Sequence, residues 1–412
     1  MPRLRKGRSL WLARRLPSFH APTLRGAIDA DVVIVGGGLT GATIAWTFAE
    51  AGFRVAVLER GRVARASTAA NSALLMQEPD EDLTALAKRY GPAAARRIWQ
   101  LGRESTRDFI RLLRRLRIAC DLHECDSIYY AARADAVDRL RREHRRRRQA
   151  GFGGRWLDAG AIRTHGNAQL DPVRACIGLM AAARSAGVQV FEHSAVRRVV
   201  RIRGGVRAMT AHGSVDASRV IVATGYATPQ FKPLAGRFRM KHTYVMATER
   251  LQRRSGAARL YPAESPKARR GMSNGIPLGD AMVWDTNRPY HYARWTHDRR
   301  LILGGGDRPA GRRKNRARAF REGIEDLRRH LTSLVPALAD VKIEFEWEGL
   351  FAMTPDGLPY VGPHRRYPRH LFALGYGGNG MTFGFLAARL LLDWFRGAQS
   401  NDLRLFAFNR KP

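Results

Sequence analysis

Cysteine is scarce in this chain, with only three residues among 412, at positions 120, 125 and 176. So few cysteines, at these spacings, supply neither a disulfide framework nor a set of metal ligands. Such scarcity is typical of a reducing compartment, so we expect a cytoplasmic protein without structural disulfides.

Long hydrophobic runs are also missing. A membrane-spanning helix needs about 18 or more apolar residues, and the best candidate, Phe383–Phe395, is too short and carries Arg389 and Asp393. The first 22 residues are rich in arginine, as in a transit peptide, but they lack the continuous apolar core of a secretory signal. We expect them to form an arm packed on the surface ahead of the first strand.

Acidic residues are few, because 36 Asp and Glu stand against 72 Lys and Arg, for a net charge of +36. Such a charge can serve binding to nucleic acid, to an anionic membrane or to acidic substrates. The basic residues are spread along the whole chain, however, and the one dense run, Arg139–Arg148, falls in a helical pattern. We therefore interpret the run as a solvated helix face and expect no nucleic-acid partner.

One strong motif stands near the start of the chain. Val32–Val35 is an apolar, β-branched run typical of a buried parallel strand, and Gly36, Gly38 and Gly41 follow it as G-x-G-x-x-G. The first glycine permits a tight turn, the second lets a pyrophosphate approach the backbone, and the third lets helix and strand pack closely. The helix expected at Leu39–Ala51 directs its N-terminal N–H groups at that phosphate.

A second predicted strand, Val55–Leu58, ends in Glu59, at the spacing of a carboxylate that accepts hydrogen bonds from ribose hydroxyls. A carboxylate there repels a 2′-phosphate, which disfavours NADP. A βαβ unit that binds nothing is the alternative, but the complete fingerprint favours a dinucleotide site.

Two kinds of pattern follow along the chain. Helical spacing over Leu83–Leu116, broken at Gly91-Pro92, and an apolar strand at Arg219–Gly225 are typical of an α/β domain. A helix over Arg316–Leu334 has one apolar face. Short, regularly spaced apolar runs predict an antiparallel sheet; they are Thr243–Ala247, Ala281–Trp284, His291–Trp295 and Leu301–Leu303.

A second glycine-rich loop, Gly375–Gly380, leads into the apolar helix expected at Phe383–Phe395. Its N–H groups and the positive helix end point to a second anionic locus. Two such loops at opposite ends of one chain suggest one long ligand held across the domain, which fits FAD better than NAD.

Together these motifs resemble the D-amino-acid oxidase (DAO) type of FAD-dependent oxidoreductases, a family that includes glycine, sarcosine and γ-glutamylputrescine oxidases. The likeness covers about residues 8–400. It rests on segments that occur in the family's order: Asp31–Gly41 with Glu59, Ser67–Asn71, Ala223–Gly225, Trp284–Thr286, Tyr290–Arg294, Gly304-Gly305, Trp347–Gly349, Thr354–Gly362 and Gly377–Gly380.

This resemblance implies an α/β protein with a Rossmann-like FAD-binding domain and a second α+β substrate domain built on an antiparallel sheet. We expect the FAD domain in residues 1–80, 151–235 and 345–412, and the substrate domain in residues 81–150 and 236–344. Non-covalent FAD is expected, because the loop 61–80 holds no His or Cys for attachment. The expected cofactor residues are Gly36, Gly38, Leu39, Thr40, Gly41, Glu59, Arg60, Ser67, Thr68, Asn71, Val196, Ala223, Thr224, Gly225, Gly377, Gly378, Asn379, Gly380 and Met381.

For the substrate, the resemblance implies an Arg or Lys on the sheet that holds a carboxylate, a role suited to a bidentate guanidinium. Tyr290, Tyr292 and Arg294 alternate and so share one strand face. If that face meets the flavin, Arg294 holds the carboxylate and the tyrosines wall the pocket. Otherwise Arg294 is one more surface arginine, since sequence alone does not fix the register. Lys241, on a neighbouring strand, could position substrate or activate oxygen.

Three hypotheses about activity follow. The resemblance implies oxidation of a C–N bond in an amine or amino acid, by hydride transfer to the flavin, with oxygen as acceptor. A second hypothesis is a flavin dehydrogenase of a 2-hydroxy acid that passes electrons to a quinone or carrier. The third is a basic flavoprotein that binds nucleic acid or oxidises an amine on tRNA, although no nucleic-acid module is recognisable.

Overall fold

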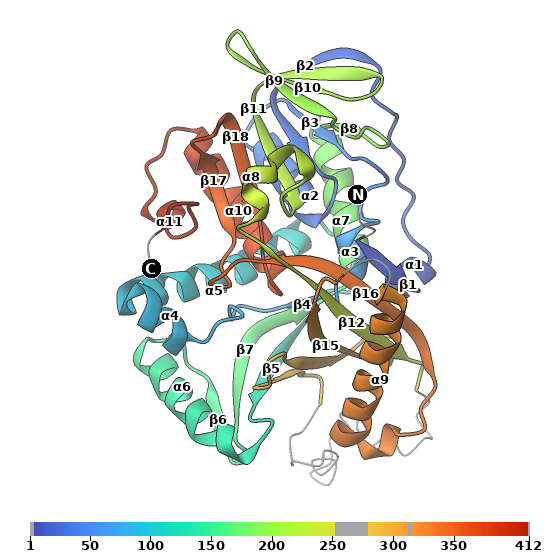
Figure 1. Ribbon diagram of the computed structural model, residues 1–412, viewed down its shortest axis with the longest axis vertical. Coiled ribbons are helices and arrows are strands. Elements are labelled where there is room, and N and C mark those ends of the chain that lie inside the picture. Colours follow the sequence, from blue (N-terminus) through green and yellow to red (C-terminus); the bar gives the residue numbers. More distant parts are fainter. Residues whose placement is uncertain (1–3, 252–278, 312–314, 411–412) are drawn as a thin grey trace.

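Two β-sheets organise the described part of the chain, residues 4–251, 279–311 and 315–410 of the computed structural model (Figure 1). Within these ranges the first sheet has eight strands, and its centre is parallel in the order β18-β11-β2-β3-β8. β17 and the β9-β10 pair add to it in antiparallel fashion. The bounds are β2 Gly26–Val35, β3 Val55–Leu58, β8 Gln189–Phe191, β9 Arg198–Ile202, β10 Gly205–Met209, β11 Gly213–Gly225, β17 Tyr360–His364 and β18 Tyr367–Leu374.

The predicted strand–turn–helix–strand unit forms the middle of this sheet. Between β2 and β3 runs α2, Leu39–Glu50, which packs against α7, Pro172–Ser185, and α10, Gly380–Phe395. Apolar side chains of all three helices belong to the main hydrophobic core. The Rossmann-like domain is therefore confirmed, with α10 beginning three residues before the predicted position.

Most of the other predicted helices are also present. The spacing over 83–116 is two helices, α4 Leu83–Tyr90 and α5 Pro92–Arg115, divided at Gly91 as predicted. α9 occupies Arg316–Leu334 and packs on the second sheet. The short helices are α1 Leu10–Ala13, α3 Ser67–Ala70, α8 Lys232–Ala235 and α11 Asn401–Arg404. None of the helices in the described ranges has the length and apolar character that crossing a bilayer requires.

Among the described residues the second sheet has ten strands, and all its pairs there are antiparallel except β13–β5. It includes the predicted antiparallel runs, which confirms the second sheet domain. Its bounds are β1 Arg5–Gly7, β4 Leu74–Leu75, β5 His123–Tyr130, β6 Arg155–Leu157, β7 Ala161–Gln169, β12 Arg239–Thr248, β13 Met282–Asp285, β14 His291–Trp295, β15 Leu301–Pro309 and β16 Ile343–Met353. In Figure 1 the two sheets occupy opposite halves of the molecule, with β16 running between them.

The division into domains stays a proposal, but sheet membership shifts its boundaries. β6 and β7 fall in the stretch 151–235, and most of β16 falls in 345–412, both assigned above to the FAD domain. All three strands pair within the ten-stranded sheet instead. An apolar pattern identifies a strand but not its partner, so the sequence could not place these segments.

The N-terminal arm is part of the fold, and the prediction of a surface arm is wrong. β1 pairs with β16, and Leu10 and Trp11 are each 1% exposed. The Ser9 hydroxyl donates to the Ala69 carbonyl at 2.6 Å, and the Trp11 indole N–H donates to the Asn71 carbonyl at 2.7 Å. The arm thus buries its few apolar side chains against residues beside α3.

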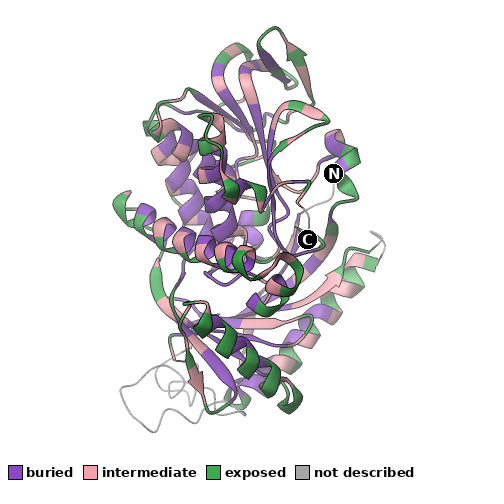
Figure 2. Ribbon diagram, turned by 90° about the vertical axis from the view of Figure 1, so that its left-hand side faces the viewer, coloured by how far each residue is buried: buried purple, intermediate pink, exposed green. Residues whose placement is uncertain are grey.

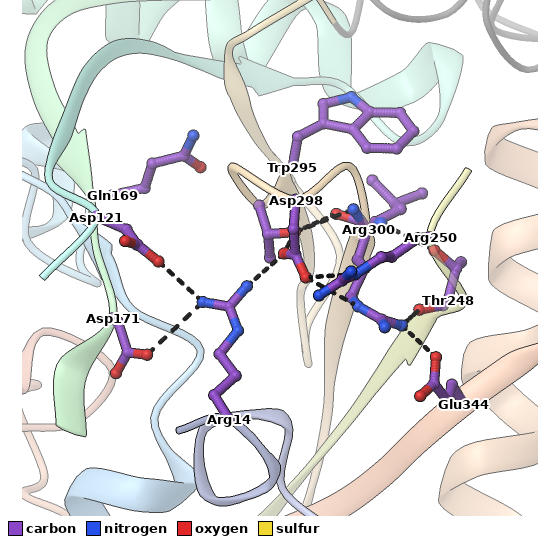
Figure 3. Close-up of polar contacts among 12 residues, drawn as sticks. Arg14, Asp121, Gln169, Asp171, Thr248, Arg250, Trp295, Asp298, Arg300 and Glu344 are labelled. Atoms are coloured by element: carbon purple, nitrogen blue, oxygen red, sulfur yellow. Dashed lines mark hydrogen bonds and ion pairs between the residues drawn. The ribbon is translucent and has the colours of Figure 1, made fainter. Parts of the chain in front are cut away.

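Arg14, directly after α1, ties this arm to both halves of the molecule (Figure 3). Its Nη1 lies 3.0 Å from Asp121 Oδ2 and 3.6 Å from Asp171 Oδ2, while Nη2 donates to Asp298. Asp171 caps α7, and Asp298 follows β14 and also pairs with Arg300. One guanidinium therefore joins the arm, a helix of the first domain and the second sheet.

The basic run 139–148 lies in α6, Val137–Gln149. Many of its arginines are exposed, as on the outward faces of other helices (Figure 2), but Arg147 is 2% exposed. Its Nε donates to Glu143 Oε1 at 2.8 Å, and its guanidinium lies over the Trp99 ring at 4.5 Å. The predicted solvated face is therefore present, and Arg147 lies on the buried side of the same helix.

Candidate active site

A first cavity lies where the parallel strands β2, β3 and β11 end. Ligands of open α/β sheets bind at this edge. Most of the predicted cofactor residues line it, which are Gly36, Gly38, Leu39, Thr40, Glu59, Arg60, Ser67, Thr68, Asn71, Val196, Ala223, Thr224, Gly225, Gly380 and Met381. Gly41 does not line this cavity, because it lies where α2 packs against the end of β2.

The glycines of the first loop have the predicted geometry. Gly36 has a φ of +116°, a conformation that favours glycine. A Cβ on Gly41 would lie 1.9 Å from the Gly36 carbonyl oxygen, so only glycine allows α2 to sit this close to β2. Gly38 precedes α2 without a side-chain cap, which leaves the helix start open to the cavity. This is the arrangement that a pyrophosphate requires.

The Glu59 carboxylate is held by backbone N–H groups on both sides. Gly37 donates to Oε2 at 2.7 Å and Gly61 donates to Oε1 at 2.8 Å. The carboxylate lines the same cavity as the glycine loop. Each oxygen has a second lone pair for a ribose hydroxyl, so these residues fit the adenosine end of a dinucleotide.

In the second glycine loop, two backbone N–H groups already have acceptors within the protein, which the sequence did not indicate. The N–H of Gly377 donates to the Ala352 carbonyl at 3.2 Å, and that of Gly378 donates to Asp80 Oδ2 at 2.6 Å. These two amides are used within the protein, so the expectation that they are available to an anion is wrong. The start of α10 follows directly, again without a side-chain cap on Asn379.

A second cavity joins the first and extends to the ten-stranded sheet. The residues common to both are Ser67, Asn71, Gly225, Tyr226, Tyr376 and Gly380. Further in, its wall is largely aromatic, with Trp284, Tyr290 and Tyr292 from β13, β14 and the loop between them. We call it the substrate cavity.

The predicted substrate residues divide into two groups. Tyr290 and Tyr292 line the substrate cavity, whereas Arg294 and Lys241 do not. Arg294 is 2% exposed, and its guanidinium donates to the carbonyls of Ser72 at 2.8 Å and Leu170 at 3.0 Å. Gln169 and Trp295 accept further bonds. The interpretation of Arg294 as a carboxylate receptor is wrong, because these structural contacts already use its donors.

Three carboxylates that the sequence analysis missed line the substrate cavity: Glu78, Asp80 and Asp307. No lysine or arginine lines it within the described ranges. A signal was available in the sequence, because residues 78–82 read Glu-Pro-Asp-Glu-Asp in a chain that is poor in acids.

Asp80 sits between the second glycine loop and the aromatic wall. Besides the Gly378 N–H, Oδ1 lies 3.5 Å from the Tyr290 hydroxyl, which donates to it. Burial raises the pKa of Asp80 to about 6, and the charge of Asp307 adds to this, while the Gly378 hydrogen bond and Arg288 oppose it.

Asp307 reaches the cavity from the end of β15. Burial raises its pKa as well, against a hydrogen bond from Thr243 and the charges of Lys241 and His291. Lys241 therefore does not line the cavity, and its charge affects the site through the pKa of Asp307.

A dinucleotide cavity in a Rossmann-like domain, continuous with a cavity on a second sheet, is typical of a two-domain flavin oxidoreductase. The family model for DAO, FAD dependent oxidoreductase, matches residues 31–394, and the chain belongs to this family of FAD-dependent enzymes.

Two curated relatives and one solved structure show how far the similarity extends. The chain is 30% identical to γ-glutamylputrescine oxidoreductase of Escherichia coli (strain K12), over 92% of this chain and 87% of that protein. It is 26% identical to glycine oxidase of Bacillus licheniformis, over 89% and 93% of the two chains. The crystal structure of glycine oxidase from Geobacillus kaustophilus has the same fold, with a TM-score of 0.73, 22% identity and coverage of 93% of this chain and 99% of that one.

Proposed function

We propose that the protein oxidises a C–N bond of an amine, with FAD in the first cavity and the substrate in the second. The observation that carries the proposal is the junction of the two cavities at Ser67, Asn71, Tyr376 and neighbouring residues. A substrate in the aromatic cavity lies directly at the inner end of the cofactor cavity. Held there, it is oriented for reaction.

When bound, FAD supplies the two-electron acceptor for a hydride from the carbon beside the nitrogen, and water then hydrolyses the resulting imine. The chain holds the cofactor through the Gly36–Gly41 turn, the Glu59 carboxylate and the start of α10. Non-covalent binding is part of the proposal, since the residues from 59 to 71 that line the first cavity include no His or Cys. Tyr290, Tyr292 and Trp284 position the substrate.

The names of the relatives support an amine or amino acid, since one acts on γ-glutamylputrescine and the other on glycine. Between these two, the walls favour the amine. A carboxylate is held in proteins by a cationic donor such as arginine, and no lysine or arginine of the described segments lines the substrate cavity. The same observation counts against the alternative of a 2-hydroxy acid dehydrogenase.

An anaerobic screen over amines, amino acids and 2-hydroxy acids, read by loss of flavin absorbance, tests the proposal. We expect bleaching by amines. Bleaching by 2-hydroxy acids alone would overturn the proposal in favour of the dehydrogenase. Oxygen as acceptor is proposed too, and rapid peroxide formation on readmitting oxygen is the expected result, whereas turnover only with a quinone or another carrier would contradict it.

A further inference from the structure

Building on the proposed amine oxidation, we propose that the substrate carries a second positive charge. It is an aliphatic diamine or polyamine, and its remote ammonium group is recognised by the carboxylates of Glu78 and Asp307, with Asp80 between the loop and the aromatic wall. These three side chains give the substrate cavity a negative wall in a protein whose net charge is +36.

Glu78 provides the first argument. It is 2% exposed, and its Oε1 accepts from the Ser127 hydroxyl at 3.1 Å. Its Oε2 is buried and has no hydrogen-bond partner among the described residues. A buried carboxylate oxygen without a donor is costly, and this side chain lines the substrate cavity. The charge of the Arg147 guanidinium acts on this carboxylate, but Arg147 donates no hydrogen bond to it. A ligand ammonium that reaches the side chain from the cavity therefore adds the missing donor.

The backbone of Glu78 fixes this side chain relative to the cofactor end of the cavity. Its carbonyl accepts from Asn379 Nδ2 at 2.7 Å, and Asn379 immediately precedes α10. Glu78 Oε2 thus belongs to a segment that is anchored by a hydrogen bond to the second glycine loop.

Asp80 and Asp307 provide the second argument. They line one cavity from different segments, and the charge of Asp307 disfavours the ionised form of Asp80. The cationic groups that act on them are Arg288 for Asp80, and Lys241 and His291 for Asp307. None of these three lines the cavity. A cation inside the cavity is therefore what relieves the repulsion.

The aromatic wall fits the rest of such a molecule. The Trp284 and Tyr290 rings are 6.3 Å apart in an edge arrangement, and Tyr290 and Tyr292 are 6.2 Å apart. Aromatic faces attract ammonium groups and pack against methylene chains. An alkyl chain with an ammonium at each end satisfies both the aromatic and the acidic parts of this wall.

The test compares three compounds that share one reacting CH₂–NH₂ group and one chain length, namely pentylamine, 1,5-diaminopentane and 5-aminopentanoate. The holoenzyme is mixed with each under anaerobic conditions, and the concentration dependence of flavin bleaching gives a Kd and a limiting rate. We expect the diamine to have a Kd about 10- to 100-fold below that of the monoamine, as a charged hydrogen bond provides. The amino acid should bind most weakly. Diamines of four and six carbons locate the best spacing.

Variants then assign the effect to the carboxylates. Glu78→Gln and Asp307→Asn keep size and remove charge, so each should reduce the preference for the diamine over the monoamine, expressed as the ratio of their Kd values, at least about tenfold. Asp158→Asn is the matched control, because Asp158 is exposed and lines neither cavity. Flavin content and thermal unfolding report whether each variant is folded.

The outcomes separate the two proposals. If no amine bleaches the flavin, the proposed function fails. If monoamine and diamine bind the wild-type enzyme equally well, the function stands and the second charge is wrong. Because that comparison uses only the wild-type enzyme, it can refute the inference even if a variant fails to fold. If Glu78→Gln, Asp307→Asn and Asp158→Asn reduce the preference for the diamine equally, that preference arises from overall charge and not from Glu78 and Asp307.

Discussion

Replacing Arg14 with methionine should destabilise the enzyme by about 3 kcal/mol. Removing one partner of a buried ion pair costs about 3–5 kcal/mol, because the other charge stays buried. Here Asp171 is 0% exposed, and its nearest other cation is Arg174 Nε at 3.9 Å. The lower end of the range applies because Asp298 keeps its contact with Arg300.

The corresponding change in melting temperature follows from chain length. An unfolding entropy of about 2.1 cal/mol/K per residue gives about 0.9 kcal/mol/K for 412 residues, so Tm should fall by about 3–4 °C. Arg15→Met is the matched control, since Arg15 is the next residue and is exposed. Scanning calorimetry at fixed FAD concentration measures both. If Arg15→Met lowers Tm as much as Arg14→Met, the reasoning about the bridged carboxylates is refuted.

Three other changes test different parts of the structure. Gly41→Ala should yield protein without bound flavin, by absorbance, since its Cβ would lie 1.9 Å from the Gly36 oxygen; Gly236→Ala, with open space around it, should retain the flavin. Asp80 has a folded pKa of about 6, above its unfolded value, so its contribution to stability is present below about pH 4 and lost as pH rises through 6. The free energy of unfolding of Asp80→Asn, measured by urea titration, should therefore rise by about 2 kcal/mol relative to that of the wild type between pH 4 and pH 7. A difference between the two proteins that does not change with pH would contradict this. Arg294→Met should cost about 3 kcal/mol through its lost carbonyl contacts, yet leave the preference for diamine over 5-aminopentanoate unchanged.

The cofactor half of the molecule could be predicted in detail from the sequence. Its determinants are local, because the Gly36–Gly41 turn, the following helix and Glu59 occur within one short stretch and each has one structural solution. The substrate half could not be predicted to the same depth. Tyr290 and Tyr292, which alternation places on one strand face, both line the substrate cavity, although Tyr290 lies in the loop before β14.

Arg294 shows why the same rule failed two residues later. Sharing a strand face says nothing about where along the face a cavity ends, and the Ser72 and Leu170 carbonyls lie at the position that Arg294 reaches. Glu78 and Asp307 are 229 positions apart in sequence, and only the folding of the ten-stranded sheet, which contains both β4 and β15, brings them to one cavity. A local sequence pattern contains no information about which residues so far apart in the chain come together.

The pairing of β1 with β16 also affects how the protein behaves in concentrated solution. β1 is the outermost strand of the ten-stranded sheet, and an outermost strand offers unpaired N–H and C=O groups to other molecules. It is only three residues long and carries Arg5 and Lys6. Short, charged edges resist strand-to-strand association between molecules. The arm thus protects the long β16 from intermolecular pairing, and deleting it would expose a template for aggregation.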